Sequence, residues 1–393
     1  MLQSAGASSL LFSILGNPME LCYPGKLPFD SIVRGARVPF SAEIDPKRSA
    51  LIEGDNLSVL RSLLDRSIRF DLCYIDPPFA TGHVFRQSEE RSSTISPSAG
   101  SGLAYGDLLK GSAFIEFMRQ RIILIRELLT EEGSFYLHTD DKIGHYLKII
   151  LDEVFGVRHF RNDISRIKCN PKNFQRKAYG NSKDVIYFYS KSKKNIWNDP
   201  REGLADMDVK QLFRKIDGTG RRYTTVPVHA PGETLKGATA QPWRGLLPPP
   251  GRHWRAHPDE LERLNQQGLL EWSAKGNPRR ILYADEHTGK KVQDSWIFKD
   301  PPYPRYPTEK NPELLLRIIA ASSRPDSWVL DCFAGSGTTL AACQQLGRCW
   351  LGVDQSPAAI DTIRKRFAAM QPAVDYQFIA AGAGTTPDAV FKD

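Results

Sequence analysis

The sequence predicts an α/β fold in which a mostly parallel sheet carries helices on both faces. Residues 70–75, 328–331 and 349–354 are short apolar runs, which are typical of buried strands. A helix is predicted between the second and third runs, around residues 340–343. A strand, a helix and a second strand in this order are typical of a βαβ unit, which predicts parallel pairing.

The first chemically informative motif is Asp76-Pro77-Pro78-Phe79, which directly follows the run at residues 70–75. A carboxylate, two rigid prolines and an aromatic ring at a strand end can hold a flat polar ring by its edge and its face. Such a site suits chemistry on a nucleobase. The alternative is a strand that ends at an ordinary proline turn, because proline fixes φ and interrupts a sheet wherever it occurs.

The second motif is the glycine-rich turn Asp331-Cys-Phe-Ala-Gly-Ser-Gly-Thr-Thr339, which follows the second apolar run. Its glycines, Gly335 and Gly337, allow a sharp turn and let backbone N–H groups approach a ligand at a helix N-terminus. Asp354 follows Asp331 by 23 residues, a spacing at which nucleoside-binding units place the carboxylate that grips ribose. The alternative is a purely structural turn, and the glycine spacing matches neither a dinucleotide fingerprint nor a P-loop.

Together the two motifs resemble those of amino-group DNA methyltransferases of the N6-adenine/N4-cytosine family. Residues 331–339 resemble the S-adenosylmethionine (SAM) loop of that family, and residues 76–79 resemble its catalytic motif. Because the catalytic motif comes first, the chain is similar to the circularly permuted beta group and to type III modification subunits. The resemblance extends over roughly residues 46–370. Further stretches that are similar to the family and agree with this order are residues 53–64, 133–140, 145–156 and 306–310.

The resemblance implies a SAM-dependent, Rossmann-like methyltransferase domain that is circularly permuted and carries an inserted target-recognition region. The predicted segments are an N-terminal extension, a catalytic half, a basic insert, a SAM-binding half and a C-terminal tail: residues 1–45, 46–194, 195–300, 301–372 and 373–393. In the extension, the start of the chain lacks the basic residues of a signal peptide.

Basic charge is concentrated in the middle of the chain. Residues 158–300 hold 28 Lys and Arg against 16 Asp and Glu, whereas the whole chain has a net charge of +8. Such a surplus is expected where a protein contacts nucleic-acid phosphates, and the alternative is a solvated basic surface. Trp243 and Trp254 lie among these basic residues, where indoles can contact bases or can anchor the insert to its own core. Residues 259–267 are predicted to form a short helix.

The resemblance assigns roles to individual residues. Asp76 and the Pro77 carbonyl would each accept an N–H bond from the exocyclic amine of a flipped-out base, while Pro78 sets the angle and Phe79 stacks on the ring. The helix start at residues 311–312 would lie near the methionine carboxylate of SAM. The implied cofactor-binding residues are Asp55, Asn56, Thr308, Lys310, Asp331, Phe333, Ala334, Gly335, Ser336, Gly337, Thr338, Thr339 and Asp354.

Adenine N6 is the predicted acceptor, because enzymes of this family that methylate cytosine N4 commonly carry Ser where this chain has Asp76. Cytosine N4 remains an alternative, as does a non-catalytic DNA-binding subunit on the same scaffold. A second string of the same type, residues 300–303, is predicted to be a proline-locked linker because no apolar run precedes it. His138 and Asp140 match the family pattern without a role that the sequence assigns.

Composition narrows the remaining classes. The six cysteines form no Cys-x-x-Cys pair, which argues against a zinc site and fits a reducing cytoplasm. No apolar stretch of about twenty residues exists, so a membrane-spanning helix is not expected. The predicted partner is double-stranded DNA, and a homodimer and a cognate restriction endonuclease remain open.

Overall fold

The computed structural model divides the chain into two compact units, residues 1–200 with 293–393 and residues 201–292. The residues that it describes are 20–37, 43–66, 68–77, 85–86, 103–105, 111–170, 177, 179–304 and 309–381. Of residues 85–86 and 103–105 only the backbone is described.

The larger unit is built on a nine-stranded sheet with the strand order β16-β6-β7-β5-β2-β17-β18-β1-β19. All neighbouring strands pair in parallel except β6 with β7 and β7 with β5. The strands of this sheet are β1 (Ala50–Glu53), β2 (Phe70–Ile75), β5 (Leu129–Thr139), β6 (Phe160–Ile167), β7 (Lys183–Ser190), β16 (Ser295–Ile297), β17 (Trp328–Asp331), β18 (Cys349–Asp354) and β19 (Gln377–Ala380). A short antiparallel pair, β3 (Phe85–Arg86) and β4 (Leu103–Tyr105), lies outside it.

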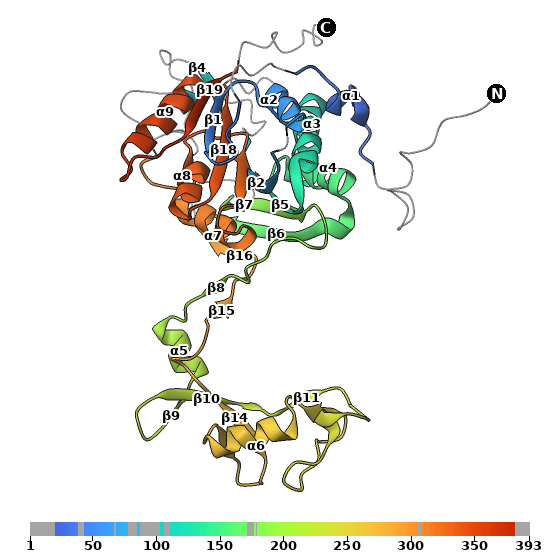
Figure 1. Cartoon of the computed structure of the whole chain (residues 1–393), viewed down its shortest axis with the longest axis vertical. Helices are drawn as coiled ribbons and strands as arrows, with labels where there is room; N and C mark the ends of the chain where they lie inside the picture. Colours follow the sequence, from blue (N-terminus) through green and yellow to red (C-terminus); the bar gives the residue numbers. More distant parts are fainter. Residues whose placement is uncertain are drawn as a thin grey trace, which may run out of the picture. The chain divides into compact units, whose positions relative to one another are not determined.

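Helices cover both faces of this sheet, as the sequence predicts. Helices α2, α3 and α4 lie on one face and α7, α8 and α9 on the other (Figure 1). The helices of the larger unit are α1 (Phe29–Val33), α2 (Asn56–Leu64), α3 (Ser112–Leu128), α4 (Gly144–Phe155), η1 (Val157–His159), α7 (Pro312–Ser322), α8 (Thr338–Gln345) and α9 (Pro357–Ala368).

Alternation along the strands builds the two layers. Cys73 and Ile75 of β2 pack in the same core cluster as Ile122 and Ile125 of α3. Side chains of neighbouring positions point to the opposite face, where Tyr136 of β5 bonds through its hydroxyl to Ser322 of α7 at 2.7 Å. Strands buried on both faces are typical of parallel sheets. This explains why the motif strands appear in the sequence as continuous apolar runs.

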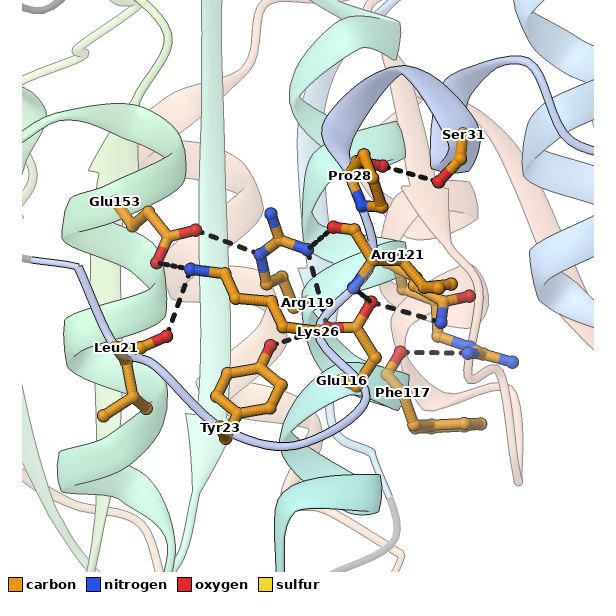
Figure 2. Close-up of polar contacts among 12 residues, drawn as sticks. Leu21, Tyr23, Lys26, Pro28, Ser31, Glu116, Phe117, Arg119, Arg121 and Glu153 are labelled. Carbon is orange, nitrogen blue, oxygen red and sulfur yellow. Dashed lines mark hydrogen bonds and ion pairs between the residues drawn. The ribbon is translucent and has the colours of Figure 1, made fainter. Parts of the chain in front are cut away.

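A segment near the N-terminus is bound to the larger unit by buried polar contacts (Figure 2). The Lys26 ammonium lies 3.0 Å from a Glu153 carboxylate oxygen on α4, and the Tyr23 hydroxyl donates to Glu116 on α3 at 2.6 Å. Arg119 of α3 joins them, because its guanidinium donates to Glu153 at 3.0 Å and to the Leu27 carbonyl at 2.9 Å. Residues 20–37 are therefore packed on α3 and α4, although the sequence analysis places them in an extension.

Two more segments lie elsewhere than the sequence analysis places them. Residues 377–380, assigned there to a C-terminal tail, form strand β19, which pairs in parallel with β1 at the edge of the sheet. Residues 293–300, assigned to the insert, belong to the larger unit because β16 pairs in parallel with β6. Both segments are short and lie at an edge of the sheet, where a strand has one neighbour. Their apolar patterns are therefore too weak to predict a strand from the sequence.

The smaller unit has its own core around two tryptophans. Trp243 and Trp254 are 4% and 2% exposed and pack with Leu261 and Leu264 of the predicted helix, α6. These indoles therefore build the core of the smaller unit, which is the second of the two roles that the sequence left open for them. The elements of this unit are β8 (Arg201–Glu202), α5 (Asp206–Leu212), β9 (Lys215–Ile216), β10 (Arg222–Pro227), β11 (His229–Pro231), η2 (Ala238–Ala240), β12 (Arg252–Trp254), α6 (Pro258–Gln266), β13 (Leu270–Trp272), β14 (Pro278–Tyr283) and β15 (Lys290–Lys291).

In the described part of the chain, none of the helices is long and apolar enough to cross a membrane.

Candidate active site

The two sequence motifs meet in space because their strands are neighbours. Strands β2 and β17 pair in parallel, with Val329 opposite Leu72 and Leu330 opposite Cys73. Residues that follow the two strands therefore lie at the same edge of the sheet. The chain runs from β17 outward to β18 on one side and from β2 outward to β5 on the other. Such a reversal of strand order opens a crevice, in which open α/β sheets bind their ligands.

Asp76 comes directly after β2, and its carboxylate is mostly buried. Its Oδ2 lies 2.7 Å from the ammonium of Lys310, and the two side chains are 15% and 9% exposed. Its Oδ1 is buried and has no hydrogen-bond partner among the described residues. A buried polar atom without a partner is costly, so this oxygen marks a place where a ligand N–H is expected. Pro77 follows and is described, whereas Pro78, Phe79 and Thr308 lie outside the described residues.

The glycine turn adopts the conformation that the sequence predicts. Gly335 and Gly337 have φ values of 50° and 72°, a region in which only glycine is free of strain. A Cβ atom on Gly337 would lie 2.8 Å from Cγ1 of Ile363 in α9. The turn is closed by a bond from the Gly337 N–H to the Ala334 carbonyl at 2.7 Å, and α8 begins at Thr338. The Ser336 and Thr338 hydroxyls lie 2.9 Å apart.

Asp354 braces this turn from the next strand. Its Oδ2 accepts the Gly335 N–H at 2.8 Å, and its Oδ1 accepts the Ser356 N–H at 2.9 Å. Burial raises the pKa of Asp354. The carboxylate that the sequence analysis assigns to ribose is thus engaged by backbone N–H groups at the mouth of the crevice.

Asp331 is the most deeply buried carboxylate of the site. It accepts the Phe333 N–H at 3.0 Å and is only 3% exposed. Burial raises its pKa to about 7, against the hydrogen bonds from Thr339 and Phe333, and the charges of Asp76 and Asp354 raise it further. Asp331 therefore lies close enough to both other carboxylates to feel their charges, and Lys310 lies on one of them, Asp76.

Asp55 and Asn56 reach the glycine turn from the start of α2. Asp55 caps this helix by accepting the Ser58 N–H at 2.9 Å, and the Asn56 amide donates to the Cys332 carbonyl at 2.8 Å. Arg121 of α3, which the sequence analysis does not single out, donates to the Asn56 side chain at 2.6 Å and to Asp55 at 3.4 Å. The sequence signal that could have indicated Arg121 is its position in a helical segment that is otherwise rich in apolar residues.

Phe333 extends the apolar side of this site. Its ring lies 6.2 Å from that of Phe117 in α3, and the Arg121 guanidinium lies 3.4 Å over the Phe117 ring. The glycine turn with its Phe333 ring, the Asn56 amide of α2 and the Phe117 ring of α3 therefore come together from three elements.

His138 supports the catalytic strand from within the sheet. It is fully buried, with Nδ1 2.8 Å from the Tyr74 hydroxyl and Nε2 3.3 Å from Asp184. Burial lowers its pKa, although Asp184 and Asp76 act in the opposite direction. Asp140 instead accepts backbone N–H groups of residues 142 and 143 before α4. Both residues hold local structure.

The second Asp-Pro-Pro string lies in a different environment. Asp300 is bound by the fully buried Arg166, whose Nη2 lies 2.5 Å from Asp300 Oδ1. The same guanidinium donates to the Phe298 carbonyl at 2.8 Å and to Asp184 at 3.3 Å. The Asp300 N–H also bonds to the Lys168 carbonyl at 2.8 Å. This carboxylate therefore anchors the chain after β16 to strand β6.

The fold and the site together define a nucleoside-binding α/β enzyme with a carboxylate at the reversal of strand order. No three His, Cys, Asp or Glu side chains of the described residues are grouped as a metal ion would require. The glycine turn leaves room for backbone contacts, and the unpaired Asp76 oxygen supplies an acceptor. These features fit a nucleoside cofactor beside a substrate that donates an N–H.

Comparisons with known proteins agree with this class. The family described as DNA methylase, with the name N6_N4_Mtase, matches residues 70–365. The type II methyltransferase M.EcaI of Enterobacter cloacae is 38% identical over 370 residues, which are 90% of this chain and 78% of that one. The EcoPI Mod subunit of the type III restriction-modification enzyme of Escherichia phage P1 is 26% identical over 76% of this chain and 55% of that protein. Among solved structures, the M1.HpyAVI–SAM complex has a TM-score of 0.45 at 15% identity, over 81% of this chain and 98% of that one.

The chain belongs to the N6/N4 DNA methylase family. It is a SAM-dependent DNA methyltransferase that acts on an exocyclic amino group of a DNA base.

Proposed function

We propose that this enzyme methylates the N6 amine of adenine within a specific sequence of duplex DNA. The observation that carries the proposal is the buried Oδ1 of Asp76, which has no hydrogen-bond partner in the part of the chain that the structure describes. A carboxylate is a stronger acceptor for an amine N–H than the serine that is common in N4-cytosine enzymes of this family. The relatives named as type III Mod subunits and as a type II methyltransferase support action on DNA.

The chemistry follows from what the residues can accept. The lone pair of an adenine amine is delocalised into the ring, so the amine is a poor nucleophile. Asp76 and the Pro77 carbonyl each accept one N–H bond, which favours a pyramidal nitrogen with its lone pair directed out of the plane. That nitrogen would then be oriented to accept the methyl group directly, after which it would lose one proton to solvent. Orientation of the two reactants supplies several kcal/mol of the acceleration.

SAM supplies an electrophilic methyl group on a sulfonium when it is bound. The residues that would hold it are those around the glycine turn: Phe333, Gly335 and Ser336 on the turn, with Asn56 and Asp354 beside it. Arg121 would keep the Asn56 amide in place through its 2.6 Å bond. The target amine is hidden in the base pair of a duplex, so the adenine must be flipped out, at a cost of a few kcal/mol. Pro78 and Phe79 are proposed to receive it.

The smaller unit is proposed to read the target sequence. Three of its arginines, Arg252, Arg255 and Arg279, gather near His229, with Arg252 Nη1 3.3 Å from its ring and Arg255 Nε 3.2 Å from its carbonyl. Burial and then the charges of these arginines lower the pKa of His229. Within this unit, which is described throughout, none of the three pairs with a carboxylate. Such a cluster is suited to DNA phosphates.

The basic surplus is not confined to the smaller unit. Residues 201–292 hold 16 Lys and Arg against 11 Asp and Glu, whereas residues 158–200 hold 11 against 3. Of the surplus found over residues 158–300, the larger share therefore belongs to residues 158–200 of the larger unit. We propose that both segments contact the DNA backbone.

The biological setting is proposed from the relatives. Restriction-modification is the setting that the names of M.EcaI and the EcoPI Mod subunit suggest. A cognate restriction endonuclease is proposed on the same ground, whereas a homodimer and a cytoplasmic location stay predictions from the sequence. The permuted order of the beta group likewise stays a prediction, based on the catalytic motif that precedes the SAM loop in the chain.

The test is nucleoside analysis by mass spectrometry after the purified protein has acted on unmethylated DNA with SAM. N6-methyladenine is expected, and the Asp76→Ala variant serves as the control that shows none. N4-methylcytosine without N6-methyladenine would contradict the choice of adenine. Sequencing that detects methylated bases, applied to a host that carries the gene, then gives the recognition sequence.

A further inference from the structure

The ion pair between Lys310 and Asp76 joins two segments that are far apart in the chain. Lys310 Nζ lies 2.7 Å from Asp76 Oδ2, and both side chains are mostly buried. The family resemblance places Lys310 near the methionine end of SAM and gives it no part in the chemistry of the base. Its observed partner is instead the carboxylate that is proposed to receive the target amine.

The residues on either side of Lys310 are anchored by side-chain contacts, which hold the backbone of the lysine in place. Glu309 forms an ion pair with Arg366 of α9, and their side chains are 8% and 9% exposed. Asn311 caps α7 by accepting the Glu313 N–H at 2.9 Å, and its amide donates to the Lys299 carbonyl at 3.0 Å. The backbone thus delivers the ammonium to the end of β2 from a rigid framework.

The carboxylates around Asp76 indicate what the Lys310 ammonium does there. Asp331 and Asp354 are carboxylates at the ends of the next two strands, and the charge of Asp76 influences Asp331. Like charges at this edge of the sheet repel one another, and the ammonium of Lys310 offsets that repulsion. Its charge-assisted bond to Oδ2 also fixes the direction in which Oδ1 points.

We propose that Lys310 is a positioning residue for methyl transfer, which binds Oδ2 of Asp76 and so fixes the orientation in which Oδ1 accepts the target amine. The inference rests on the proposed function. It assigns the two oxygens of one carboxylate to different partners, Oδ2 to the protein and Oδ1 to the substrate. The unpaired state of Oδ1 agrees with this division.

The test measures recognition of the amine without SAM. Two duplexes carry the recognition sequence, one with adenine at the target position and one with purine, which lacks the amine. For each protein variant, the dissociation constant of the purine duplex is divided by that of the adenine duplex, so that a larger ratio means a stronger preference for the amine. The intrinsic cost of flipping each base cancels when these ratios are compared between variants. Loss of a hydrogen bond to a charged acceptor corresponds to a change of roughly tenfold or more in that ratio.

We expect Lys310→Met to reduce the ratio by about tenfold, as Asp76→Asn does, and the double variant to be no worse than either single variant. Lys310→Arg, which keeps a cation, is expected to recover part of the preference. Lys365→Met is the matched control, since Lys365 is 77% exposed and pairs only with Asp361 on the same helix among the described residues. Thermal melting of each variant establishes that it is folded.

Two results would overturn the inference. One is a ratio in Lys310→Met equal to that of the wild type, even if SAM binding is weakened, since Lys310 would then serve the cofactor alone. The other is a double variant in which the two losses add, because the residues would then act independently. Methylation by the wild-type protein is recorded in parallel. If it is absent, the proposed function fails and takes this inference with it.

Discussion

Substitution of Gly337 by alanine tests whether the glycine turn is built as the structure shows. The residue has a φ of 72°, and an added Cβ would lie 2.8 Å from Cγ1 and 3.4 Å from Cγ2 of Ile363. The left-handed conformation costs alanine about 1 kcal/mol, and overpacking of this kind costs roughly 1–3 kcal/mol. We therefore expect Gly337→Ala to lower the free energy of unfolding by about 2–4 kcal/mol.

Gly347→Ala is the matched control, because its φ is 67° and an added Cβ would meet nothing within 4 Å. It should cost only the backbone term, about 1 kcal/mol. Urea denaturation, followed by tryptophan fluorescence, measures both variants. Ile363→Ala combined with Gly337→Ala should be less destabilised than the sum of the single variants, because the overlap is removed. If Gly337→Ala were as mild as Gly347→Ala, the predicted contact with α9 would be refuted.

Four further predictions concern the site and the DNA surface. Asp76→Ala should abolish methyl transfer and change the retention of DNA that lacks the recognition sequence by less than about threefold in a filter-binding assay, since phosphate contacts supply nonspecific binding. Arg121→Met should weaken SAM binding about tenfold in calorimetry, because the Asn56 amide loses its charged partner. The pKa of Asp331 is raised to about 7 from 3.8, so the folded state holds the extra proton and stability should fall as pH rises between these values. Asp331→Asn should flatten that fall in a series of denaturation curves, and an unchanged slope would contradict the assignment. Replacement of both Arg252 and Arg255 by Gln should reduce the salt dependence of DNA binding by about two units, whereas Arg221→Gln, whose guanidinium is paired with Asp285 and Glu286, should change it less.

The elements that carry the motifs were predictable because their signals are local. The runs at residues 70–75 and 328–331 form strands β2 and β17 with the predicted bounds, and residues 349–354 form β18. The Asn-Pro start of α7 at residues 311–312 is likewise confirmed by its cap. Strand burial, helix caps and glycine turns each depend on a few consecutive residues, so a single sequence is sufficient to find them.

The less local features were missed or misplaced. Arg121 and Lys310 reach their partners from helix α3 and from the segment before α7, and neither contact leaves a pattern in neighbouring residues. The edge strands β16 and β19 were assigned to an insert and a tail, because pairing with β6 and β1 alone decides that they are strands. For Trp243 and Trp254 the sequence left base contact and core packing open, and apolar burial decides for the core of the smaller unit.

The sequence by itself determined that a strand-end carboxylate and a nucleoside-binding turn occur in one chain, with the order and composition of an amino-group DNA methyltransferase. Only the tertiary structure decided that β2 and β17 are neighbours, so that Asp76 and the glycine turn share one crevice. The sequence already favoured residues 76–79 over residues 300–303, and the structure adds that Arg166 occupies Asp300, while one oxygen of Asp76 has no partner among the described residues. The physical reason is that strand order and side-chain pairing depend on burial and charge summed over distant segments, which no local pattern records.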